Sequence, residues 1–235
     1  MLDQYSRTKL LLGNEYINIL KDKKIAVFGL GGVGGNACDA LARAGIMNFV
    51  IFDNDTVNIT NLNRQLVANQ NELNKYKVDV MEEHLKSINE DIEVIKHQEF
   101  YDQNSGFDFQ GIDYIVDAID TVSSKILLIE KANELNIPII SALGCGNRLD
   151  PSKIKYTDIM KTEGDPLAKV LRYELRKRNI KHLDVIYSTE EPIKHKEESE
   201  EITNKRMTIG SSPFVPPTAG IMMAYVVIKN LLGNF

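Results

Sequence analysis

Two patterns of apolar residues organise the first part of this chain. The first is a short unbroken apolar run, which predicts a strand covered on both faces of a parallel sheet. Strands are expected at residues 25–28, 49–52, 92–95, 114–116 and 138–142. The second is an apolar residue at every third or fourth position, clearest at 75–88, which predicts a helix with one buried face. Further helices are expected at 33–44, where Gly45 is typical of a left-handed C-cap, and at 124–135.

Strands that alternate with helices in this way predict a right-handed, doubly wound sheet. The expected fold class is therefore α/β, a Rossmann-like doubly wound, mostly parallel sheet with a C-terminal extension. A helical arm over residues 5–22 precedes the first strand. We expect a single domain over 1–235, with a nucleotide-binding core at about 23–150 and a substrate- or RNA-facing extension at about 151–235.

The pattern of the extension is less regular. A strand is expected at 153–158, a helix at 165–178, a second strand at 184–188 and a charged loop at 195–206. The last predicted element is an apolar helix at 219–232. It is shorter than the roughly 20 residues that span a bilayer. We therefore expect a buried helix and no membrane contact.

Composition narrows the class of protein. With 235 residues, 43% of them hydrophobic and 26% charged, the chain is typical of a globular protein with one sizeable core. No secretory signal is visible at the N-terminus, and two cysteines cannot build a disulfide framework, so we expect a cytoplasmic protein. The net charge of −5 argues mildly against a general nucleic-acid binder, and an RNA partner would need a local basic patch.

The turn after the first strand carries the clearest chemical signal. Gly29, Gly31 and Gly34 have the spacing of a turn that lets the backbone approach a phosphate at a helix N-terminus, and Gly32 leaves further room. Asp53 follows the second strand, at the offset where an acid binds a ribose hydroxyl. These features predict a nucleotide site without separating NAD from ATP.

The segment after Asp53 favours ATP. Arg64 is a cation of the kind that stabilises phosphate charge in a transition state, and Lys77, which begins the next helix region, can reach the same phosphates. Asn61 can donate to a phosphate oxygen. Asp55 is open to two interpretations, a turn residue or a helper that orients the loop, and the first is favoured.

Two acids end the fourth strand, at the sheet edge where open α/β sheets bind their ligands. Asp120 is a candidate ligand for Mg²⁺ bound to the phosphates. Asp117 can instead cap the next helix, and we expect at least one of the two acids to be structural.

Taken together, these motifs resemble the ubiquitin-activating-enzyme-like (ThiF/MoeB/HesA) superfamily. The matching segments are Gly29–Gly34, Asp53-Asn-Asp55, Asn61-Leu-Asn-Arg64-Gln65, Lys77 and Asp117-Ala-Ile-Asp120. The resemblance implies that Asp53 holds ribose, that Asn61, Arg64 and Lys77 hold phosphates, and that Asp120 works near Mg²⁺. It also implies a homodimer in which an N-terminal arginine reaches the partner subunit's ATP. Arg7 is the candidate, and Lys9 competes with it.

The second half resembles the tRNA threonylcarbamoyladenosine dehydratase subfamily. The segments that carry this resemblance are 144–151, 158–162, 165–168, 187–190 and 214–220. It implies an enzyme that uses ATP to activate the threonine carboxylate of a modified adenosine in tRNA. The carbamoyl oxygen then closes onto that carboxylate to give an oxazolone or hydantoin-type ring. Whether activation is adenylation or phosphorylation, and whether a sulfur-relay protein is a partner, stay open.

Other readings remain available from the residues alone. An adenylyltransferase for a sulfur-carrier protein or peptide shares the ATP site, but the chain lacks the paired Cys-x-x-Cys motifs that such enzymes often carry. A nucleotide-sensing module without catalysis and a dehydrogenase are weaker alternatives. Cys38 is expected in the core, and Cys145 is not expected to act covalently. For RNA, the helix after Asp165 offers Lys169, Arg172 and Arg176 at about one-turn spacing, with Lys177, Arg178 and Lys181 beyond. These residues suit phosphate contacts, and they equally suit a solvated helix face that pairs with nearby Glu.

Overall fold

A seven-stranded sheet forms the centre of the molecule in the computed structural model, which describes residues 2–194 and 209–233. The strand order is β3-β2-β1-β4-β5-β7-β6, and every strand except the edge strand β6 runs parallel to its neighbour. The strands are β1 (Lys24–Phe28), β2 (Asn48–Phe52), β3 (Glu93–His97), β4 (Tyr114–Asp117), β5 (Ile139–Ala142), β6 (Ile154–Asp158) and β7 (Asp184–Ser188). The predicted α/β fold with a mostly parallel, doubly wound sheet is confirmed.

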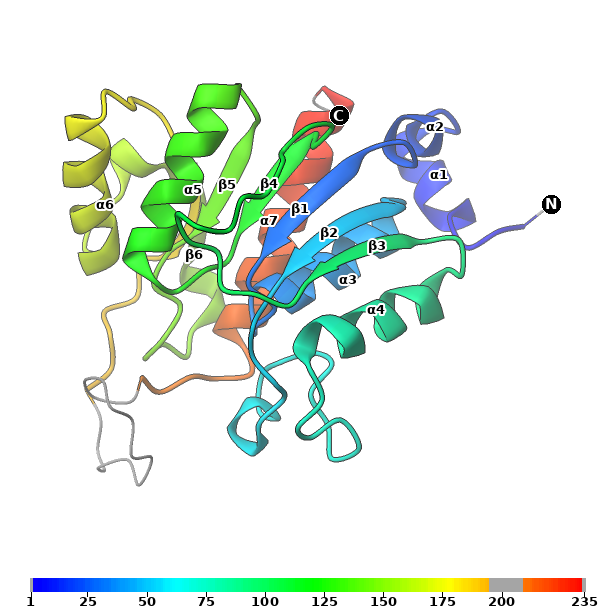
Figure 1. Ribbon diagram of the computed structural model, residues 1–235, viewed down its shortest axis with the longest axis horizontal. Helices are drawn as coiled ribbons and strands as arrows, with labels where there is room; N and C mark the ends of the chain where they lie inside the picture. Colours follow the sequence, from blue (N-terminus) through cyan, green and yellow to red (C-terminus); the bar gives the residue numbers. More distant parts are fainter. Residues whose placement is uncertain (1, 195–208, 234–235) are drawn as a thin grey trace.

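Helices cover both faces of this sheet (Figure 1). The helices α3 (Gly34–Ala44), α4 (Lys77–Ile88) and α7 (Val215–Leu232) pack on one face, and α5 (Val122–Leu135) and α6 (Pro166–Lys177) on the other. Alternate residues of β1 separate the two cores. Ile25 and Val27 face the α3 and α7 side, whereas Phe28 faces the α5 side.

The arm before the sheet differs from the single helix expected over residues 5–22. Two short helices, α1 (Ser6–Leu12) and α2 (Tyr16–Leu20), are separated by a turn at Gly13. Gly13 has φ +82°, a conformation that a helix cannot contain and that glycine adopts without steric cost. The arm lies at the amino-terminal edge of the strands (Figure 1).

Two helix starts also differ from expectation, each for a local reason. The helix expected from residue 75 begins at Lys77, because Tyr76 is held in an extended conformation by a bridge to Thr56. The last helix begins at Val215, four residues before the expected start, with prolines in its first turn. Proline is tolerated there because the first amides of a helix have no intrahelical acceptor. The short 3₁₀ turns are Ile59–Asn61, Pro151–Lys153 and Ile159–Lys161.

Residues after Asp150 complete the same sheet and the same core. β7 pairs with β5, and β6 pairs with β7. α7 packs so closely on α3 that a Cβ at Gly220 would lie 2.2 Å from the carbonyl oxygen of Val33. Within the described part of the chain, α7 is the one helix long and apolar enough to cross a membrane, and half of it is buried inside the fold. The loop expected at 195–206 lies outside the described residues.

Candidate functional site

The glycine turn between β1 and α3 has no space for side chains at two of its positions. Gly29 has φ +88°, and a Cβ there would lie 2.7 Å from the carbonyl oxygen of Ala118. A Cβ at Gly34 would lie 1.8 Å from the carbonyl oxygen of Gly29 itself. These glycines are therefore required by packing, and they allow the helix N-terminus to approach the strand end.

A cavity of about 300 Å³ opens in front of this turn, at the carboxyl ends of β1, β2 and β4. It contacts most of the residues expected to bind a nucleotide, which are Gly29, Gly31, Gly32, Asp53, Asp55, Asn61, Arg64, Lys77 and Asp120. Gly34 does not line it and lies behind the turn. Arg7 does not line it either, because α1 lies at the opposite edge of the sheet (Figure 1).

Asp53 and Lys77 form the charged floor of the cavity. The Asp53 carboxylate accepts the backbone N–H of Leu30 at 2.7 Å, from within the glycine turn, and that of Asp55 at 2.9 Å. Lys77 Nζ lies 3.6 Å from Asp53 Oδ1 and 2.8 Å from Asp55 Oδ2. Burial raises the pKa of Asp53 above its usual value, while the nearby Lys77 ammonium opposes that rise. The turn and the floor are thus tied together by hydrogen bonds.

Asp55 forms an ion pair with Lys77 at the cavity, in addition to its place in the turn after β2. Its carboxylate is 62% exposed and bonds to Lys77, whose side chain is only 6% exposed. A pair with one partner in water contributes little stability. The pair instead positions the Lys77 ammonium at the cavity, where a phosphate oxygen can replace the Asp55 carboxylate.

The loop after β2 forms the cationic side of the cavity. Arg64 Nη1 donates to the Thr60 carbonyl oxygen and to Asn63 Oδ1, both at 2.9 Å, and its Cγ packs over Gly32. Asn61 Oδ1 accepts the backbone N–H of Asn58 at 3.0 Å, which leaves the Nδ2 amide as the donor for a ligand. The loop therefore holds its cation and its amide close to the glycine turn before any ligand binds.

The two acids after β4 separate into different environments. Asp120 is exposed at the cavity, and its carboxylate accepts a hydrogen bond from the Thr121 hydroxyl at 3.3 Å. Asp117 is fully buried and does not cap α5, whose N-cap is Thr121 without a side-chain cap bond. Asp117 instead accepts from Lys125 Nζ at 2.8 Å and Ser141 Oγ at 2.6 Å. The structural role expected for one of the acids falls to Asp117.

Lys125 was not anticipated from the sequence. It is fully buried on α5, and its ammonium neutralises Asp117 directly beneath the wall formed by Ala118, Ile119 and Asp120. The Asp117 carboxylate also accepts the backbone N–H of Ile119 at 3.2 Å. The sequence does contain one sign of this pair. Lys125 stands among the apolar positions of the predicted helix, eight residues after Asp117 at the end of the strand.

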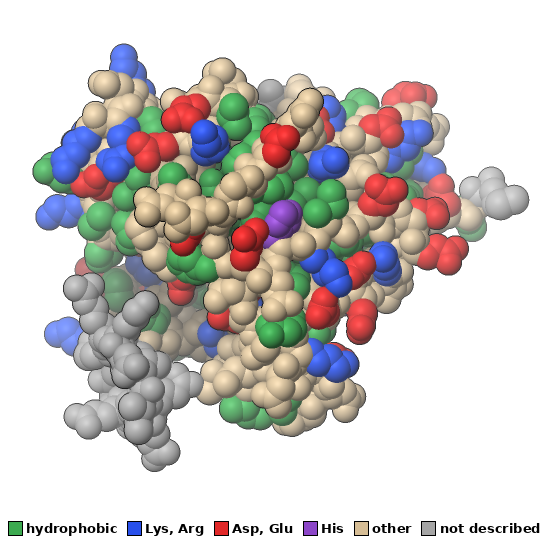
Figure 2. All heavy atoms as spheres, in the orientation of Figure 1, with side chains coloured by type: hydrophobic (Ala, Val, Ile, Leu, Met, Phe, Trp, Pro, Cys, Tyr) green, Lys and Arg blue, Asp and Glu red, His purple; other side chains and the backbone are tan. Residues whose placement is uncertain are grey.

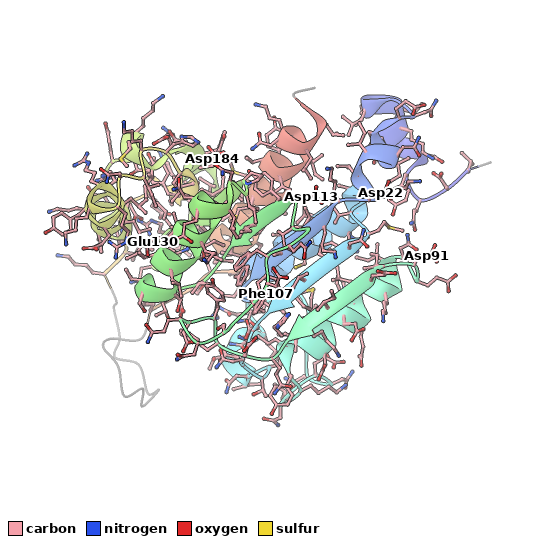
Figure 3. The ribbon with its side chains drawn as sticks, turned by 45° about the horizontal axis from the view of Figure 1, so that its top comes forward. Asp22, Asp91, Phe107, Asp113, Glu130 and Asp184 are labelled. Atoms are coloured by element: carbon pink, nitrogen blue, oxygen red, sulfur yellow. The ribbon has the colours of Figure 1, made fainter. Side chains whose placement is uncertain are left out.

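The cavity also has aromatic lining residues, which the spacing of residues in the sequence did not predict. Phe28, Phe52, Phe100 and Tyr101 line it. Phe28 stacks on Phe52 with ring centroids 4.3 Å apart, and Tyr101 meets Phe28 edge-on at 4.9 Å. Phe107, labelled in Figure 3, extends this cluster beyond the cavity. A cavity lined by both charged and aromatic side chains suits a phosphorylated compound that carries a planar base.

Magnesium would depend on the bound compound for most of its ligands. Among the described residues, no three His, Cys, Asp or Glu side chains gather as a metal site. Mg²⁺ is commonly held by one or two carboxylates together with phosphate oxygens and waters. Asp120, exposed at the cavity, fits such a site in its donor chemistry.

Neither cysteine has the properties of a nucleophile. Cys38 is buried in α3, and burial raises its pKa far above the ordinary range. Burial also raises the pKa of Cys145 to about 12. Because a thiolate is the reactive form, both thiols are unreactive near neutral pH. Cys38 is therefore a core residue, as expected.

A second buried ion pair orders the segment after β5. Arg148 donates to the Gly144 carbonyl oxygen and to the carbonyl oxygen of Glu190 at 2.9 Å, and it lies 3.3 Å from Asp165 Oδ2. Asp165 also caps α6 by accepting the backbone N–H of Ala168 at 2.8 Å. The beginning of α6 is thereby fixed at the same edge of the sheet as the cavity.

Comparison with known proteins gives a consistent result. The ThiF family matches residues 5–234. The chain is 41% identical to the tRNA threonylcarbamoyladenosine dehydratase of Bacillus subtilis (strain 168), over 99% of this chain and 96% of the relative. Crystal structures of the Escherichia coli enzyme TcdA with AMP and with ATP superpose with TM-scores of 0.89 and 0.88 at 30% identity. Each superposition covers 98% of this chain and 94% of the other.

Proposed function

The chain belongs to the ThiF family, and from that premise we propose that it is an ATP-dependent tRNA threonylcarbamoyladenosine dehydratase, a single adenylation domain. Its substrate is the modified adenosine of a tRNA, whose carboxylate is activated and then closed into a ring with loss of one water. The observation that supports this most is the gathering of Arg64, Lys77 and Asp120 around one cavity in front of the glycine turn. The whole-length match to a dehydratase supports the choice of substrate.

Activation begins when a carboxylate oxygen of the substrate attacks the α-phosphorus of ATP. An acyl-adenylate forms and pyrophosphate leaves. Arg64 and Lys77 stabilise the negative charge that builds up on the phosphate oxygens, and Asn61 donates a hydrogen bond to them. Asp53 accepts a ribose hydroxyl, since each of its oxygens keeps a second lone pair. The E. coli relative has been crystallised with AMP, which supports adenylation over phosphorylation.

Ring closure needs no nucleophile from the protein. The carbamoyl oxygen attacks the activated carbonyl carbon, AMP leaves with the bonding electron pair, and the adjacent carbamoyl nitrogen loses its N–H proton to solvent. Both reacting groups belong to one nucleoside, so holding them together supplies much of the rate. The burial of Cys38 and Cys145 agrees with a reaction that uses no thiol.

Asp120 is the residue we assign to Mg²⁺. When bound there, the ion would neutralise charge on the triphosphate. Because Asp120 is the exposed acid at the cavity while Asp117 is buried against Lys125, Asp120→Asn is expected to raise the Mg²⁺ concentration needed for turnover without unfolding the protein. A magnesium titration of both proteins measures this.

The arm supports a homodimer. No residue of α1 is buried, and Leu10 and Leu11 are 83% and 85% exposed. Apolar side chains exposed next to each other mark a surface that a second subunit covers. Arg7 lies on the same helix, so its guanidinium belongs to the partner's ATP site in this arrangement. Light scattering should give twice the mass of the chain, and Leu10→Glu should give monomers.

The reaction is tested by incubating the protein with ATP and tRNA that carries threonylcarbamoyladenosine. We expect nucleoside mass spectrometry to show loss of one water, and AMP to accumulate in the same tube. We place the reaction in the cytoplasm, with a sulfur-relay protein as an optional partner. Pyrophosphate exchange that requires a small protein ending in Gly-Gly, without any change in the nucleoside, would instead establish a sulfur-carrier adenylyltransferase.

A further inference from the structure

The outward side of α6 carries a stripe of basic and apolar side chains. Ala168, Leu171 and Leu175 are buried, which places the opposite side of the helix in solvent. The residues of that side, which we call the α6 stripe, are Lys169, Val170, Tyr173, Arg176 and Lys177, all exposed. Three of the five are cations and none is an acid. Figure 2 shows Lys and Arg side chains over this edge of the molecule, with Asp and Glu side chains among them.

The structure separates the cations of this region into two groups. Arg172 donates to the Thr162 carbonyl oxygen at 3.0 Å, and Arg178 pairs with Glu130 at 2.7 Å on the side of α5 that faces α6 (Figure 3). These two arginines fasten α6 to its neighbours. Within the described residues, Lys169 and Arg176 form no ion pair, and Lys177 pairs with Glu174 at 3.1 Å. The stripe therefore presents its charge outward.

Charge is also distributed unevenly along the chain. Residues 1–150 contain 14 Lys and Arg against 22 Asp and Glu, whereas residues 151–235 contain 14 against 11. The part of the chain that carries α6 is therefore basic within an acidic protein. A basic segment of this kind is compatible with a polyanion partner although the net charge of the protein is negative.

Tyr173 lies in the middle of the stripe and is 60% exposed. The Lys177 ammonium lies 4.0 Å from the centre of its ring. The ammonium lies over one face of the ring, so a base can stack only on the other face. Exposed aromatic rings accompanied by cations hold single-stranded nucleic acid in this way, with bases on the rings and cations on the flanking phosphates. Double-stranded RNA offers no base face to such a ring.

The helix also has a suitable position. Asp165, at its start, pairs with Arg148 of the segment after β5, so α6 begins at the sheet edge that holds the cavity. Lys169 lies one turn from that edge, and a 12-residue helix extends about 18 Å from it. An RNA that places one nucleoside in the cavity can lay neighbouring nucleotides along α6.

We propose that the α6 stripe binds single-stranded RNA, with Tyr173 stacking on an unpaired base and Lys169, Arg176 and Lys177 holding phosphates. The assignment of that RNA as the loop of the substrate tRNA rests on the proposed function. The stripe itself is defined by its chemistry, so its binding is measured without turnover.

The test measures binding of a fluorescein-labelled anticodon stem-loop RNA to the full-length protein by anisotropy, without ATP, at several salt concentrations. Tyr173→Ala should weaken binding roughly tenfold, because one base stack is lost. Tyr173→Phe should bind like the wild type. Arg176→Ala should lower the slope of log affinity against log salt by about 1. Lys131→Ala, which removes an exposed lysine from the neighbouring α5, is the matched control and should change neither quantity.

Two results of the binding assay would overturn the proposal. One is Tyr173→Ala and Arg176→Ala proteins that bind the stem-loop as tightly as Lys131→Ala, with thermal melts showing all three folded. The other is a fully paired RNA of equal length that binds as well as the stem-loop and loses as much affinity on Tyr173→Ala. Turnover is scored separately. If the wild type cyclises the nucleoside and Tyr173→Ala has the same KM for tRNA, RNA binding by the α6 stripe is refuted and the proposed function stands. If RNA binding depends on Tyr173 but the nucleoside is not cyclised, only the proposed function is refuted.

Discussion

The buried pair of Lys125 and Asp117 gives the sharpest prediction for stability. Both side chains are fully buried, and the ammonium and the carboxylate lie 2.8 Å apart. Lys125→Met removes the cation while keeping a side chain of similar length, so little empty volume is created. The Asp117 carboxylate is then left with two hydrogen bonds, from Ser141 Oγ and from the backbone N–H of Ile119.

The magnitude follows from the missing charge. Removing one partner of a buried ion pair costs about 3–5 kcal/mol, because the remaining charge has neither water nor a counter-ion. For a domain of this length that loss lowers the melting temperature by roughly 10 °C. The double variant Lys125→Met/Asp117→Asn removes both charges and keeps an oxygen to accept from Ile119. It should recover to within about 1 kcal/mol of the wild type.

Urea unfolding followed by far-UV circular dichroism measures these differences, with the m-value as a check that each protein unfolds in one step. Lys131→Met on the same helix is the exposed control and should change stability by less than about 0.5 kcal/mol. A loss below about 1 kcal/mol for Lys125→Met, at an unchanged m-value, would refute the reasoning. So would a double variant no more stable than the single one.

Four further predictions address the site. Arg64→Ala should lower kcat on the order of 100-fold with an unchanged melting temperature, because charge stabilisation of the phosphates is lost; a steady-state rate within threefold of wild type would contradict this role. Asp53→Asn should weaken ATP binding yet melt no lower at pH 7. Burial raises the pKa of Asp53, so its charge penalises the folded state above that pKa, and the penalty disappears as the pH falls through it. Calorimetry from pH 8 to 4 should show the two melting temperatures converging. Cys145→Ala should keep its activity, and the native thiol should react slowly at pH 8, because burial raises its pKa to about 12; fast labelling would count against that burial. Gly34→Ala should destabilise the fold strongly, whereas Gly31→Ala, whose Cβ meets nothing nearer than 3.9 Å, should melt close to wild type.

The fold was predictable because its signals are local. Unbroken apolar runs, separated by a glycine turn and amphipathic segments, already specify parallel strands joined by helices. That architecture brings the carboxyl ends of the strands together, so Asp53 and Asp120 could be expected at one edge without knowledge of any contact. The helix start at Lys77 was missed because a β-bridge between Tyr76 and Thr56, twenty residues earlier in the chain, decides it. The start at Val215 was missed because prolines are accommodated in the first turn of that helix.

Which residues face the cavity could not be predicted from local sequence patterns. Glycine spacing predicted both the turn at Gly29 and a ligand contact for Gly34, yet Gly34 lies behind the turn, where the close approach of α3 leaves no space. Likewise, Arg172 and Arg176 are indistinguishable as basic residues of one predicted helix. Only packing shows that Arg172 bonds to Thr162 while Arg176 faces solvent.

The sequence by itself determined the order of strands and helices, the glycine turn and the set of charged residues at one sheet edge, because backbone preference and apolar periodicity act over a few residues. The tertiary structure alone decided which charges are buried, which partners they meet and which surfaces stay open. Lys125 beneath the cavity wall and the aromatic rings of Phe28 and Phe52 are examples. The physical reason is that burial and ion pairing depend on how elements distant in the chain pack together, and no local pattern records that packing.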